Sequence, residues 1–151
     1  MDSFDLIGTL SDYAATNSWV FLYGDDAMTN YEATKKSIAD DQLILSCYPF
    51  LAAPVFTNNN KLIQITYSGI VMLGRKFESV EGTTSNLDET HIQKYTRRLK
   101  ELSQTLSTNL TLFACDNELD LINIQFELSI NKFDENIDFV AATVSFVQDA
   151  R

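Results

Sequence analysis

Residues 122–130 read Ile-Asn-Ile-Gln-Phe-Glu-Leu-Ser-Ile, and residues 140–146 read Val-Ala-Ala-Thr-Val-Ser-Phe. In each stretch large apolar residues alternate with polar or small ones, a pattern typical of a β-strand that has one face on a hydrophobic core. The segment 131–138 between them is mostly polar, which predicts a turn. We therefore expect these two strands to pair as an antiparallel hairpin.

A long amphipathic helix is predicted before this hairpin, from Asn86 to Leu106. Asn86 can cap it and Glu89 completes a variant of the capping box. Apolar residues then recur at spacings of three and four and form one stripe: Ile92, Tyr95, Leu99, Leu102 and Leu106. Cationic residues occupy the other sides: Lys94, Arg97, Arg98 and Lys100. They form either a solvated face or an electrostatic contact with an acidic neighbour. The run Leu110 to Cys115 predicts a further strand.

The first residues of the chain predict a shorter helix, capped by Asp2 or Ser3. Its apolar face is defined by spacings of three and four: Leu6, Ile7, Leu10, Tyr13 and Ala14. Strands are expected at Trp19–Tyr23, Gln42–Tyr48 and Lys61–Phe77. Aromatic residues alternate in the first of these, at Trp19, Phe21 and Tyr23, and serve either the core or a partner surface.

Proline and glycine residues in the middle of the chain limit where regular strands are expected. Phe50 to Phe56 is apolar but contains Pro54, so it is at best an edge strand or a loop. Asn58 to Asn60 predicts a turn. Gly69 and Gly74 indicate a bulge or the close approach of another backbone.

The order of these elements predicts the fold class. Strands outnumber helices, and short turns join adjacent strands. We expect an α+β domain, 1–151, with a mixed, mainly antiparallel β-sheet, an N-terminal helix and one long helix packed on one face, and a C-terminal β-hairpin.

The chain is acidic. Its 151 residues include 11 Lys and Arg against 21 Asp and Glu, for a formal net charge of −10. Such a surface repels phosphate, which argues against sequence-independent nucleic-acid binding and against docking on an anionic membrane. The acidity serves either solubility or a wall past which a polyanion slides without binding.

Few residues point to chemistry. His91 stands alone, and the adjacent acids Asp25–Asp26, Asp40–Asp41 and Asp134–Glu135 lie in polar segments typical of solvated loops. We predict no catalytic residue, no metal, no cofactor and no enzymatic activity. Cys47 and Cys115 lie in apolar runs and are expected to be buried free thiols in a reducing cytoplasm. Neither a signal peptide nor a membrane span is expected.

The helix Asn86 to Leu106 and the run 125–146, with its Asn-x-Phe-Asp turn at Asn131 to Asp134, are similar to parts of a known family. The chain resembles the tail-terminator and tail-completion proteins of tailed bacteriophages, which also form ring subunits of head-to-tail connectors. The resemblance implies a virion protein of the tail or neck, assembled in the host cytoplasm. It implies a closed ring of six or twelve copies, contacts with other tail, neck or portal proteins, and DNA that passes without specific binding.

These expectations give one leading hypothesis and two alternatives. The leading hypothesis is a ring-forming structural subunit, and the predicted subunit interface comprises Lys94, Arg97, Arg98, Asn123, Gln125, Glu127 and Phe133. One alternative is a small acidic binding module or adaptor that engages a basic protein partner. The other is a small enzyme with an unmarked acidic site.

Overall fold

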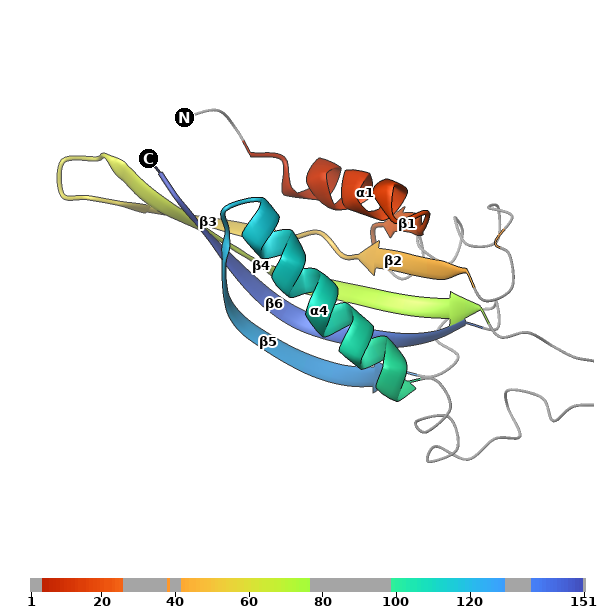
Figure 1. The fold of residues 1–151 in the computed structure, drawn as a ribbon. Helices are drawn as coiled ribbons and strands as arrows, with labels where there is room; N and C mark the ends of the chain where they lie inside the picture. Colours follow the sequence, from red (N-terminus) through yellow and green to blue (C-terminus); the bar gives the residue numbers. More distant parts are fainter. Residues whose placement is uncertain (1–3, 26–37, 39–41, 77–98, 130–136, 151) are drawn as a thin grey trace, which may run out of the picture.

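The computed structural model describes residues 4–25, 38, 42–76, 99–129 and 137–150. These residues form two helices and one six-stranded sheet (Figure 1). The helices are α1 (Leu6–Thr16) and α4 (Lys100–Asp116). The strands are β1 (Val20–Tyr23), β2 (Leu43–Cys47), β3 (Leu51–Phe56), β4 (Leu62–Lys76), β5 (Asp120–Ser129) and β6 (Ile137–Asp149).

The sheet has the strand order β1-β2-β4-β6-β5, and β3 pairs with β4 beside this path. β1 and β2 are parallel, whereas every other pair is antiparallel. β6 pairs with β4 along one side, so β2 and β3 share the other side. There β2 pairs with the second half of β4 and β3 with its first half. The structure thus confirms the predicted fold class, with both helices on one face and β5 and β6 as the closing hairpin.

The N-cap of helix α1 lies two or three residues after the predicted caps, Ser3 and Asp2. Asp5 is the N-cap, and its carboxylate accepts a hydrogen bond of 2.9 Å from the backbone N–H of Gly8. This bond satisfies one of the free donors of the first turn. Leu6, Leu10 and Ala14 then face the core, as the spacing predicted.

Helix α4 extends ten residues beyond its predicted end, and the predicted strand from Leu110 to Cys115 is wrong. The start of the predicted helix lies outside the described residues. The apolar spacing of three and four continues through the supposed strand, at Leu106, Leu110 and Phe113. All three side chains are buried against the sheet, so packing of the stripe overrides the β-propensity of a short apolar run.

The main core lies between the two helices and the sheet. Phe113 of α4 contacts both Tyr13 of α1 and Phe146 of β6 edge to face, with ring centroids 5.7 and 5.8 Å apart. Alternate residues of β6 enter this core, as predicted: Val140, Ala142, Val144 and Phe146. A smaller cluster covers part of the opposite sheet face and contains Leu22, Ile38, Ile44, Met72, Phe139 and Ala141.

Both glycines of β4 lie beneath phenylalanine rings. A Cβ atom on Gly69 would lie 2.8 Å from the Phe50 ring, and one on Gly74 would lie 2.5 Å from the Phe139 ring. The β4–β6 register runs through both positions without a shift. The predicted bulge is therefore absent there, and the close approach comes from side chains instead of another backbone.

The bulge lies in β5. The β5–β6 register shifts between Leu121 and Asn123, which leaves Ile122 as the extra residue. Ile122 is 60% exposed and Phe126 is 41% exposed, although their alternation predicted burial. Ile124 is the residue of that row that packs on the main core.

Candidate assembly surfaces

Three of the seven predicted interface residues lie in the described part of the chain. Asn123, Gln125 and Glu127 are exposed on β5, and their partners on β6 include Thr143 and Ala141. They form one row on the sheet face that points away from the helices, because Ala141 belongs to the cluster on that face. The other four, Lys94, Arg97, Arg98 and Phe133, lie outside the described residues, so the structure does not place them beside this row.

The most prominent surface feature is a β-hairpin that reaches beyond both helices (Figure 1). We call it the arm: β3, the turn at 57–61 and the first half of β4, 62–68. Every residue of β3 is exposed. The exposed large apolar side chains of the arm are Leu51, Val55, Phe56 and Ile63. Four such side chains on one projecting hairpin exceed the scattered singles of an ordinary surface.

The arm is held in shape by its turn. Thr57 donates its backbone N–H to the carbonyl of Lys61 over 2.8 Å, and Asn60 adopts a φ of 60°. Asparagine tolerates this left-handed conformation, as the Asn58 to Asn60 cluster predicted. Lys61 is the one charged residue between Leu51 and Ser68. The arm therefore offers a nearly neutral, apolar surface with a single positive charge at its tip.

The turn between α4 and β5 has the opposite character. It carries three exposed acidic residues, Asp116, Glu118 and Asp120. Asp116 is the last residue of α4 and the other two follow it, so all three lie near the helix C-terminus, where the helix dipole adds partial negative charge. The bulged Ile122 lies directly beyond them.

The two long edges of the sheet each carry an exposed aromatic residue. Tyr23 ends β1 at one edge and is 39% exposed, while Phe126 lies on β5 at the other edge. Trp19 and Phe21, which alternate with Tyr23, pack against the main core. Of the three alternating aromatic residues, two therefore serve the core and Tyr23 lies at the surface.

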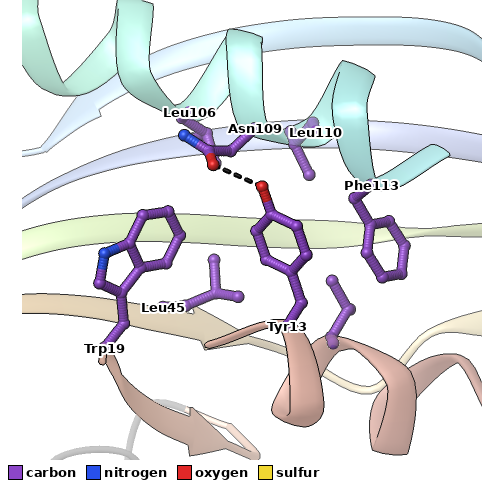
Figure 2. A pocket seen from close by; sticks show the side chains of 8 residues that line it. Tyr13, Trp19, Leu45, Leu106, Asn109, Leu110 and Phe113 are labelled. Carbon is purple, nitrogen blue, oxygen red and sulfur yellow. Dashed lines mark hydrogen bonds between the residues drawn. The ribbon is translucent and has the colours of Figure 1, made fainter. Parts of the chain in front are cut away.

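A small apolar pocket lies between the helices (Figure 2). It is lined by Leu10, Tyr13, Trp19, Leu45, Leu106, Asn109, Leu110 and Phe113. Its polar feature is a short hydrogen bond in which the Tyr13 hydroxyl donates to Oδ1 of Asn109. Burial, and secondarily the negative charge of Asp116, raises the pKa of Tyr13, so the phenol stays protonated. Both partners thus satisfy each other, and the pocket brings together no acid–base pair.

The two cysteines differ. Cys47 is fully buried, and burial raises the pKa of its thiol to about 12. Cys115 is exposed, contrary to the predicted burial, because its segment is helical and this position faces away from the stripe. Both are free thiols, as expected.

The remaining candidates for chemistry fall mostly in undescribed segments. His91 and all but Asp25 of the adjacent acid pairs lie there. Within the described ranges, no three His, Cys, Asp or Glu side chains converge as metal ligands. Neither helix of these ranges has the length and apolarity to cross a bilayer.

Sequence reasoning missed the arm, Ile122 and Phe126 as surface residues, and it left Tyr23 open between the core and a partner surface. One signal was available for the arm: Pro54 in an apolar run argued for an edge position, and an edge strand is where exposure concentrates. No sequence feature indicated the exposure of Phe126, because it alternates with polar residues just as buried strand residues do. The chain matches no protein-family model, and no curated protein is significantly similar to it in sequence.

Proposed function

We propose that this chain is a non-enzymatic structural subunit that assembles with copies of itself into a closed ring around a DNA channel, in the tail or neck of a tailed bacteriophage. The arm carries this proposal. The four large apolar side chains of the arm are exposed to water, which is unfavourable on an isolated molecule, and a neighbouring copy would remove them from water.

The sheet edges support assembly as well. Among the described strands, β1, β3 and β5 each pair on one side only. Exposed edges invite association, and a ring needs a heterologous interface in which two different patches meet. Pro54 in β3 and the bulge at Ile122 in β5 interrupt regular ladder pairing at two of these edges. Association is thereby directed to side chains and away from open-ended fibre growth.

The charge supports the DNA channel. A wall that passes DNA must not bind phosphate, and a formal charge of −10 per copy accumulates around a ring. The element order, with an N-terminal helix, strands, a long helix and a closing hairpin, is the order that the phage resemblance implies.

The test is the oligomeric state of the full chain. Size-exclusion chromatography with light scattering should give one assembled species of fixed copy number, and negative-stain microscopy should show rings with a central hole. The same rings should leave the mobility of double-stranded DNA unchanged at low salt, where attraction to phosphate would be strongest. A protein that is monomeric at every concentration contradicts the proposal and favours the acidic binding module.

A further inference from the structure

We draw no further inference here: the strongest candidate, the exposed apolar surface of the arm, belongs to the assembly surface already proposed, and nothing in the described residues shows which patch covers it.

Discussion

Strand β4 differs sharply between its two halves. In the second half Val71, Met72 and Leu73 are fully buried, because helices cover one face and a second apolar cluster covers the other. In the first half, which forms the arm, Ile63 is 42% exposed and no residue of β3 is buried. One continuous strand thus belongs to a core at one end and to a free surface at the other. The two halves differ in burial because the helices and the second apolar cluster pack mainly on the second half.

The largest effect on the free energy of unfolding is expected from a comparison of two phenylalanines, one in the core and one in the arm. Phe113→Ala should lower the free energy of unfolding by about 3–5 kcal/mol, because a fully buried ring leaves a cavity in the main core. Phe56→Ala, at 55% exposure in the arm, should change it by less than about 0.5 kcal/mol. Urea denaturation of each variant, at concentrations low enough to keep the chain dissociated, measures both. An equal loss in the two variants would show that the arm is part of the cooperative core.

The two glycines sharpen the contrast within β4. Gly74→Ala should cost about 1–3 kcal/mol, since the new methyl group meets the fully buried ring of Phe139. Gly69→Ala should cost less, because the Phe50 ring above it is only partly buried and can move aside. Thermal unfolding of both variants gives the order. A larger loss at Gly69 would mean that the base of the arm is packed as tightly as the core.

Alkaline pH should weaken the fold through its buried titratable groups. Burial raises the pKa of Cys47 from an ordinary 9.0 to about 12, so the folded chain keeps a proton that the unfolded chain releases above pH 9. This stability is complete below pH 9 and falls as the pH rises toward 12, by at most about 1.4 kcal/mol per pH unit. The raised pKa values of Tyr13 and Tyr67 act in the same direction.

The matched pair is Cys47→Ala and Cys115→Ala. The free energy of unfolding should become less steep with pH between 9 and 12 only in the first, because Cys115 is exposed. Chemical denaturation at a series of pH values measures the slope. An unchanged slope in Cys47→Ala would assign the alkaline sensitivity to the tyrosines.

The β4 contrast also explains what sequence could predict. Alternation located β4, β5 and β6 and their sheet, because period-two patterning is enforced wherever one face is covered. Ile63 and Ile65 alternate just as Val71 and Leu73 do, yet the helices reach only the second pair fully. Which part of a strand the helices cover depends on their length and crossing, and no local pattern records that.

The candidate surfaces were harder to predict for the same reason. Asn123, Gln125 and Glu127 were expected at the surface from their polar side chains, and they are exposed. Tyr23 was one of three aromatic residues left open between the core and a partner surface, and Phe126 was expected in the core. Their exposure became evident only from the structure, which places them on the two edge strands. The strand wrongly predicted at Leu110 to Cys115 rested on the β-propensity of a short apolar run. The spacing of apolar residues by three and four from Leu106 onward indicated a helix instead.

The pairing of β4 with β6 has a consequence for how the chain is made. It joins residues 64–76 to residues 137–149, so the middle of the sheet cannot form until the ribosome has finished that later segment. During the interval Ile70 to Leu73 offer apolar side chains on both faces of a strand that can pair with β2 but still lacks β6, when crowded polysomes bring identical nascent chains together. Fast synthesis of the residues between β4 and β6 shortens that exposure. A chain that ends before residue 137 lacks β6 and cannot complete the middle of the sheet.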